Sequence, residues 1–126
     1  MIFCIQLIFN SLIIMYNVND MVQTEEQYVA HMDTKQDSGL LLVSNLFENK
    51  SSQKVYFTYK FKCVRLSPSG ISANSQSGNL MAAPGQVINL SKTSLSIRPS
   101  DSYNLLLEIY DGNKLVANQA LMVPHL

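Results

Sequence analysis

Turn-forming residues divide this chain into short segments, and their spacing constrains the fold more than any other feature of the sequence. From residue 21 onward, Gly, Pro, Asn, Asp and Ser interrupt the chain roughly every 8–15 residues. No stretch of useful length has the apolar period of a helix. Between the interruptions, apolar and polar residues alternate, which is typical of strands that bury one side. The sequence therefore predicts short strands with antiparallel connections.

The clearest alternation lies between Val55 and Leu66. Odd-numbered residues of this segment are apolar and even-numbered residues are polar or basic, so one side should face a core and the other should face water. The inward set is Val55, Phe57, Tyr59, Phe61 and Cys63, and the outward set is Lys54, Tyr56, Thr58, Lys60 and Lys62.

The same signals predict the remaining strands. They are expected over 24–32, 40–48, 86–90, 94–98 and 115–122, with Tyr103, Leu105, Leu107 and Ile109 forming one more inward face. Segment 24–32 is compatible with a strand or a helix, and a strand is the preferred interpretation. Residues 71–79 are rich in Ser, Asn and Gly, and we expect a loop around a short edge strand there. Asp111-Gly112 predicts a type I′ hairpin turn, whose two central residues both need positive φ.

About seven such strands over roughly 100 residues predict an all-β fold, an immunoglobulin-like β-sandwich. The length of 126 residues allows one ordinary domain. With 47% apolar and 14% charged residues, the composition argues against a disordered chain or a coiled coil. Tyr103, which follows Asp101-Ser102 at the start of the penultimate strand, is compatible with either a tyrosine corner or a simply buried ring.

The first fifteen residues are apolar apart from Gln6, Asn10 and Ser11. This run is shorter than the roughly 20 residues of a spanning helix but matches the apolar region of a secretory signal. No basic residue precedes it and no Ala-x-Ala-like site follows, so a first strand or core helix is the alternative. We expect an export signal or an unstructured apolar N-terminus over residues 1–20, and a single immunoglobulin-like domain over residues 21–126.

Charge is balanced overall but unevenly distributed. Nine basic residues match nine acidic ones, which argues against nucleic-acid binding. The outward row of Lys54, Lys60 and Lys62 around Tyr56 is the most distinctive feature, because side chains two apart on a strand lie about 7 Å from each other. Such a row predicts a compact positive patch for a partner. The alternative is ordinary solvation, since lysine on strands also discourages aggregation.

Residues that could carry catalysis are sparse. His31 and His125 are the only imidazoles, and neither has a nucleophile or an acidic cluster beside it in sequence. We therefore expect no enzyme, no cofactor and no metal site. Cys63 could be a redox thiol, because Lys62 and Arg65 supply positive charge. A buried packing thiol is the preferred interpretation, since Cys63 belongs to the apolar side of its strand and has no second cysteine near it.

Three segments between Val55 and Leu121 resemble the curli assembly family of the CsgC/CsgH type. They are F-T-Y-K-F-K-C-V-R-L-S (57–67), G-N-L-M-A-A-P-G-Q-V-I-N-L-S-K-T-S-L-S-I-R-P-S-D (78–101) and Y-N-L-L-L-E-I-Y-D-G-N-K-L-V-A (103–117). The match lies in the order of an alternating strand, a Ser/Gly-rich loop, a Pro-Gly turn, a Pro-Ser-Asp turn and a terminal Asp-Gly hairpin. It covers a little over half of the chain.

The resemblance implies a small periplasmic protein with an immunoglobulin-like fold that prevents curli subunits from forming amyloid prematurely. Its partners would be unfolded or early oligomeric curli subunits, with no nucleic acid, no membrane in the mature form and a monomeric state. The CsgC branch carries a Cys-x-Cys pair where this chain reads Phe61-Lys62-Cys63. A thiol-exchange role is therefore not implied, and the chain looks more like the CsgH branch.

Combined with this resemblance, the basic row gives a hypothesis for a client-binding surface. Its members would be Lys54, Tyr56, Lys60, Lys62 and Arg65, with Arg65 at the end of the row. Two other functions remain open at this point. One is a generic immunoglobulin-like binding or adhesion module at the cell surface, and the other is a thiol redox factor acting through Cys63.

Overall fold

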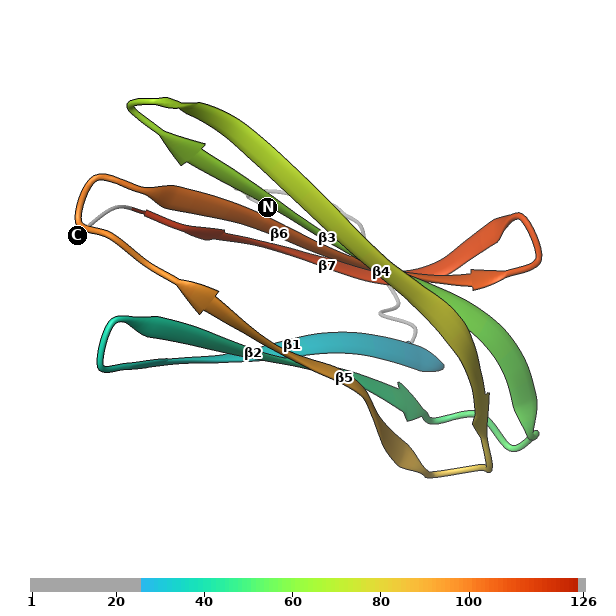
Figure 1. Cartoon of the computed structure of the whole chain (residues 1–126). Helices are drawn as coiled ribbons and strands as arrows, with labels where there is room; N and C mark the ends of the chain where they lie inside the picture. Colours follow the sequence, from blue (N-terminus) through green and yellow to red (C-terminus); the bar gives the residue numbers. More distant parts are fainter. Residues whose placement is uncertain (1–25, 125–126) are drawn as a thin grey trace, which may run out of the picture.

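Seven antiparallel β-strands form two stacked sheets in the computed structural model, which describes residues 26–124 (Figure 1). The strands are β1 (Tyr28–Asp37), β2 (Leu40–Asn49), β3 (Val55–Ser67), β4 (Gly70–Ala82), β5 (Val87–Ser96), β6 (Ser102–Asp111) and β7 (Lys114–Val123). This architecture confirms the predicted all-β class and the antiparallel connections. The predicted export signal over residues 1–20 lies outside the described residues.

The two sheets have the strand orders β1-β2-β5 and β4-β3-β6-β7. A constant-type immunoglobulin domain keeps its fourth strand with the first, second and fifth. Here β4 pairs instead with β3, from Val55↔Ala82 to Ser67↔Gly70. Strand β3 therefore lies inside a four-stranded sheet, between β4 and β6, and its outward side chains have neighbours on both sides.

The core lies between the sheets and is built from the predicted alternation. Phe61, Leu107 and Ile109 are fully buried, and Cys63 is 3% exposed. At one end of the core, the ring of Tyr28 contacts Phe57 edge-on, with 5.0 Å between centroids. The buried apolar set is Ala30, Met32, Leu41, Val43, Phe47, Val55, Phe57, Phe61, Cys63, Leu80, Ala82, Tyr103, Leu105, Leu107 and Ile109.

Tyr103 joins the two sheets where the chain crosses from β5 to β6. Its hydroxyl donates a hydrogen bond to the carbonyl oxygen of Ser96, seven residues earlier at the end of β5. The ring is buried, at 2% exposure. A buried tyrosine that bonds back to the upstream backbone at this corner is a tyrosine corner, so the structure decides between the two interpretations that the sequence left open.

The largest correction concerns residues 71–79, which were expected to form a loop around a short edge strand. They belong to β4, which runs unbroken for 13 residues and pairs with β3 along its whole length. The sequence hides this strand because Ser72, Asn74 and Gln76 are exposed although they lie on the inward side, so no alternation is visible there. Pairing with β3, not intrinsic propensity, makes the segment a strand.

Two smaller corrections concern β5 and the last hairpin. Segments 86–90 and 94–98 form one strand with a register shift opposite Asn45 and Leu46. Such an irregularity interrupts the alternation and makes a single strand look like two. The last turn has Gly112 and Asn113 at its centre, because Asp111 already pairs with Lys114. Only Gly112 has positive φ there, at 60°, so a type I′ turn was wrong and a type II′ turn fits.

Candidate client-binding face

The outward side of β3 carries the predicted basic row. Lys54, Tyr56, Lys60 and Lys62 are all exposed on this side, with the Tyr56 side chain 67% exposed. Lys54 extends its ammonium group over the Tyr56 ring, 5.6 Å from the centroid, which is within the range of a cation–π contact. The structure thus brings four of the five predicted residues onto one face.

The strands beside β3 give the basic row two different borders. On the β4 side, Lys60 lies opposite Ser77 and Lys62 lies opposite Ser75, which are both small and polar. On the β6 side, Lys60 lies opposite Glu108. An acidic residue therefore borders the row on the β6 side, whereas only small polar residues border it on the β4 side.

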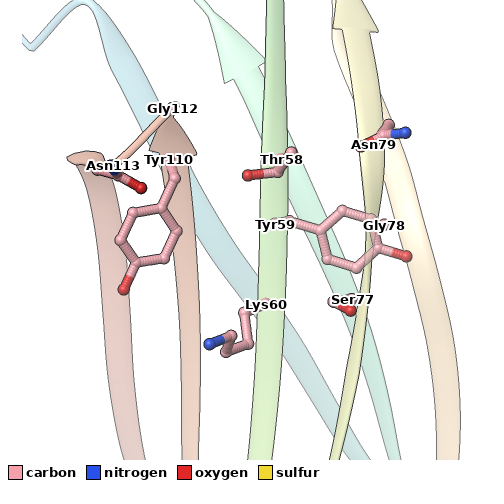
Figure 2. A pocket seen from close by; sticks show the side chains of 9 residues that line it. All are labelled: Thr58, Tyr59, Lys60, Ser77, Gly78, Asn79, Tyr110, Gly112 and Asn113. Carbon is pink, nitrogen blue, oxygen red and sulfur yellow. The ribbon is translucent and has the colours of Figure 1, made fainter.

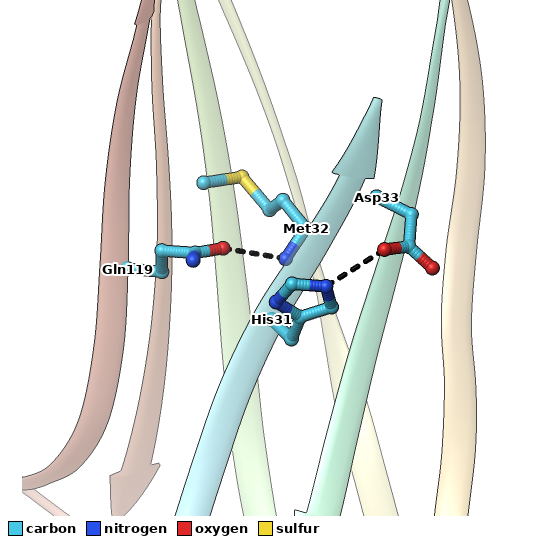
Figure 3. A network of polar contacts seen from close by, with 4 residues as sticks. All are labelled: His31, Met32, Asp33 and Gln119. Carbon is cyan, nitrogen blue, oxygen red and sulfur yellow. Dashed lines mark hydrogen bonds and ion pairs between the residues drawn. The ribbon is translucent and has the colours of Figure 1, made fainter. Parts of the chain in front are cut away.

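The lysines of this row have no salt-bridge partner among the described residues. Within residues 26–124, the one contact between basic and acidic side chains joins His31 Nε2 to Asp33 Oδ1 at 2.7 Å, on the other sheet (Figure 3). The ammonium groups of Lys60 and Lys62 are therefore not held by a carboxylate of the described residues. The nearest effect of Glu108 is on Tyr110: desolvation is the larger cause that raises the pKa of the Tyr110 hydroxyl, and the Glu108 carboxylate is the smaller one.

Shallow hollows flank the basic row. One of them has a volume of about 470 Å³. Figure 2 shows Lys60 and Tyr110, which line it from neighbouring strands, with Thr58 and Ser77 beside them. A second hollow of about 440 Å³ is mainly apolar. It is lined by Lys62, Val64, Asn104, Leu105, Leu106, Ala120, Leu121 and Met122. The face therefore offers positive charge, aromatic surface and apolar surface within one sheet.

Sequence reasoning missed the apolar part of this face. Met81 pairs with Tyr56, and Leu106 pairs with Lys62, so both border the basic row. Met122, on β7, is 70% exposed. The even-numbered side of β6 was a visible signal, but only the strand register shows that these residues lie beside the lysines.

Arg65 does not lie on this face, contrary to its predicted place at the end of the row. It is an odd number of residues from Lys62, so it shares the inward side of β3 with Cys63. There it lines a small hollow of about 220 Å³ together with Cys63, Ser72, Asn74, Leu95, Ser96 and Tyr103. The positive charge of Arg65 therefore acts on the thiol and not on the basic row.

Cys63 is buried, as the packing interpretation predicted. Burial raises the pKa of its thiol, and the opposing effect of the Arg65 guanidinium is smaller. A thiol that stays protonated is a poor nucleophile. Among residues 26–124, no group of three or more acidic, histidine or cysteine side chains is arranged to hold a metal ion.

Tyr59 and Gly78 hold the middle of β4 in place. They are directly opposite each other, and the Tyr59 ring lies against Gly78 (Figure 2). A Cβ at position 78 would lie 2.9 Å from Tyr59 Cε1, so only glycine fits without movement. The Tyr59 hydroxyl then donates a hydrogen bond of 3.3 Å to the carbonyl of Leu90 on β5. One aromatic side chain thereby links β3, β4 and β5.

The strand order makes this protein an immunoglobulin-like β-sandwich whose fourth strand lies in the larger sheet. No protein-family model and no curated protein matches the chain by sequence. Solved structures that share its fold include two curli-family proteins, CsgC and CsgH. The curli protein CsgC of E. coli superposes with a TM-score of 0.62 and 24% identity, over 74% of this chain and 96% of that one. R. palustris CsgH superposes with a TM-score of 0.55 and 15% identity, over 72% and 89%.

These two likenesses agree with the resemblance inferred from the sequence, and at this identity they show the fold. Their coverage of nearly all of each neighbour matches the span of the seven strands. Within the described residues, no helix is long and apolar enough to cross a membrane.

Proposed function

We propose that this protein acts in the periplasm as a chaperone-like inhibitor that delays the amyloid polymerisation of curli subunits. The observation that carries the proposal is the basic row of Lys54, Lys60 and Lys62, exposed around Tyr56 on a fold shared with curli protein CsgC. The likeness to CsgH supports the same class of role. The function needs no catalytic group and no cofactor.

A rigid sheet face of this kind suits a brief encounter with an amyloid precursor. Amyloid grows when strands add to an exposed edge or when sheets stack. Three unpaired ammonium groups would attract the carboxylates of an early oligomer and raise the encounter rate, and this effect weakens with salt. Tyr56 and the apolar hollow at Leu106 and Met122 would then supply contacts that salt does not screen.

The test is the lag phase of curli major-subunit polymerisation, followed with an amyloid dye and a substoichiometric amount of the protein. We expect a long extension of the lag at low salt and a shorter one at high salt. If the folded protein leaves the lag unchanged even at low salt, the proposal fails. Stoichiometric binding to a folded partner would then favour a surface-binding module.

A charge reversal maps the face. The triple variant Lys54→Glu, Lys60→Glu and Lys62→Glu should abolish the lag extension while its unfolding curve stays close to that of the wild type. A matched control applies the same change of net charge at Lys35, Lys50 and Lys92, which are exposed away from this face. Unchanged inhibition by the first variant would remove the basic row from the mechanism.

A further inference from the structure

Strand β4 is an open edge of the four-stranded sheet. Within residues 26–124 it is the outermost strand, with β3 on one side and no described strand hydrogen-bonded on the other (Figure 1). An edge strand leaves half of its backbone N–H and C=O groups without a partner in the sheet, and a second chain can pair with them. At 13 residues, β4 shares with β3 the greatest length of the seven strands.

The register shows which residues offer their backbone. Ser67 and Gly70 close a two-residue hairpin, and such a closing pair is hydrogen-bonded to itself. Hydrogen-bonded and non-bonded pairs alternate along an antiparallel ladder, so even-numbered residues of β4 bond to β3. Odd-numbered residues then direct their amides outward. The closing pair Asp111↔Lys114 of the last hairpin gives the same alternation across β6 and β3.

The edge carries none of the usual protection against pairing. Proteins guard exposed edges with lysine, proline, bulges or short strands. Gly70–Ala82 contains no charged residue and no proline, and its pairing with β3 has no register shift. The residues whose backbone amides point away from β3 are Ile71, Ala73, Ser75, Ser77, Asn79 and Met81.

The basic row determines the chemistry of what can pair there. Strands in a sheet lie about 4.8 Å apart, so a strand added to β4 would lie about 9.6 Å from β3. Side chains opposite Ser75 and Ser77 in the added strand would share the face of Lys62 and Lys60. The serines are too short to block that approach, and a lysine stem reaches roughly 6 Å. Carboxylates on the added strand would therefore meet both ammonium groups.

We propose that β4 captures its partner by strand addition, and that the partner is an extended segment with acidic side chains on one side. The captured segment pairs its backbone with the odd-numbered residues of β4 and places its carboxylates against Lys60 and Lys62. This inference rests on the proposed function, because it specifies how an amyloid-forming segment is held. A growing strand occupied in this way cannot pair with another subunit.

A second copy of this chain fits the edge less well. Two paired β4 strands would place the two basic rows three strand spacings apart, about 14 Å, with like charges facing each other. Gly70–Ala82 contributes no acid to offset that repulsion. The charge pattern therefore favours an acidic partner.

The double variant Ser75→Pro and Ser77→Pro tests the edge. Proline there removes two outward amides and no ladder bond to β3, so the sheet should stay folded. The lost bonds should weaken binding of a short peptide in which Glu alternates with Thr by about tenfold. The control, Ser75→Thr and Ser77→Thr, keeps both amides and should bind as the wild type does. Equal binding by the folded proline variant would overturn the inference.

Backbone amide exchange in the wild-type protein gives a second test that needs no variant. The Glu/Thr peptide should slow exchange at Ala73, Ser75, Ser77 and Asn79, and a Lys/Thr peptide should not. Protection confined to residues outside β4, or equal protection in concentrated protein without peptide, would overturn the inference, the latter in favour of self-pairing. If wild type delays fibre growth and the proline variant does so equally, only strand addition fails. If wild type has no effect on fibres, the proposed function fails.

Discussion

The two long sides of the sandwich treat their edge strands differently. On one side, β1 lies beside β7, and the side chain of Gln119 accepts a hydrogen bond of 2.6 Å from the backbone amide of Met32 (Figure 3). On the other side, β4 is fixed from within by Tyr59, but no described side chain bonds to its outward amides. On the first side, which we call the closed side, a side chain of β7 bonds to a backbone amide of edge strand β1. On the second side, which we call the open side, the outward amides of edge strand β4 have no such partner among the described residues.

Charge follows the same division. Strand β1 carries Asp33, Lys35 and Asp37, all exposed, which discourage pairing with another chain. Strand β4 carries no charge at all. A sandwich that protects β1 and leaves β4 unprotected favours β4 over β1 as the place where a guest strand can pair.

The alternation of amides along β4 leads to the prediction with the largest effect. Gln76→Pro should cost about 2–4 kcal/mol of unfolding free energy, because it removes a bond to β3 and leaves the carbonyl of buried Phe61 unpaired. Ser77→Pro should cost under about 1 kcal/mol, because its amide points outward. Urea unfolding measures both. Equal costs would show that the assignment of inward and outward amides is wrong.

The contact between Gly78 and Tyr59 gives the second prediction. Gly78→Val should cost about 1–3 kcal/mol, because the new side chain overlaps the Tyr59 ring. The effect should be much smaller in a Tyr59→Ala background, where the space is free. A double-mutant cycle of unfolding free energies measures this coupling. Additive costs would mean that Tyr59 does not fix the middle of β4.

A strand was predicted correctly from the sequence where its inward side faces the core along its whole length. Phe61, Leu105 and Leu107 are buried at every second position, so their strands were predicted from period alone. The length of strand β4 was underestimated because its inward residues near Gln76 extend beyond the core, and Gly78 looked like a turn residue. Its glycine serves a packing contact across the strand pair, which no pattern within one strand reveals.

The candidate face was predicted in part for the same reason. Tyr56, Lys60 and Lys62 belong to β3 and Lys54 directly precedes it, so the period of two placed them on one side correctly. Arg65 was misplaced because it breaks that period by one residue. The apolar neighbours Leu106 and Met122 come from other strands, and the register that aligns them depends on the fold.

The closed side of the sandwich gives the third prediction. Gln119→Ala should cost about 1–2 kcal/mol, because it leaves the amide of buried Met32 without a partner. Hydrogen exchange at Met32 should accelerate at the same time. The matched change on the open side is Gln76→Ala, whose side chain makes only an exposed contact of 3.5 Å with Thr93. That variant should lie within about 0.5 kcal/mol of wild type. Similar costs would contradict the difference between the two sides.

The smallest effect concerns Cys63, a buried residue of β3 that pairs with Asn74 of β4. Burial raises the pKa of its thiol, so the folded state holds the proton at pH values where the unfolded chain has lost it. Stability from this group is complete below the ordinary thiol pKa of about 8.5 and is lost as pH rises from there towards the folded pKa. For one proton, the unfolding free energy cannot change by more than about 1.4 kcal/mol per pH unit. Urea unfolding between about pH 8 and pH 9.5 keeps the measurement below the tyrosines, whose usual pKa is about 10. Cys63→Ala should remove the slope at the expense of some packing, and a slope that persists in this variant would assign the pH dependence to another group.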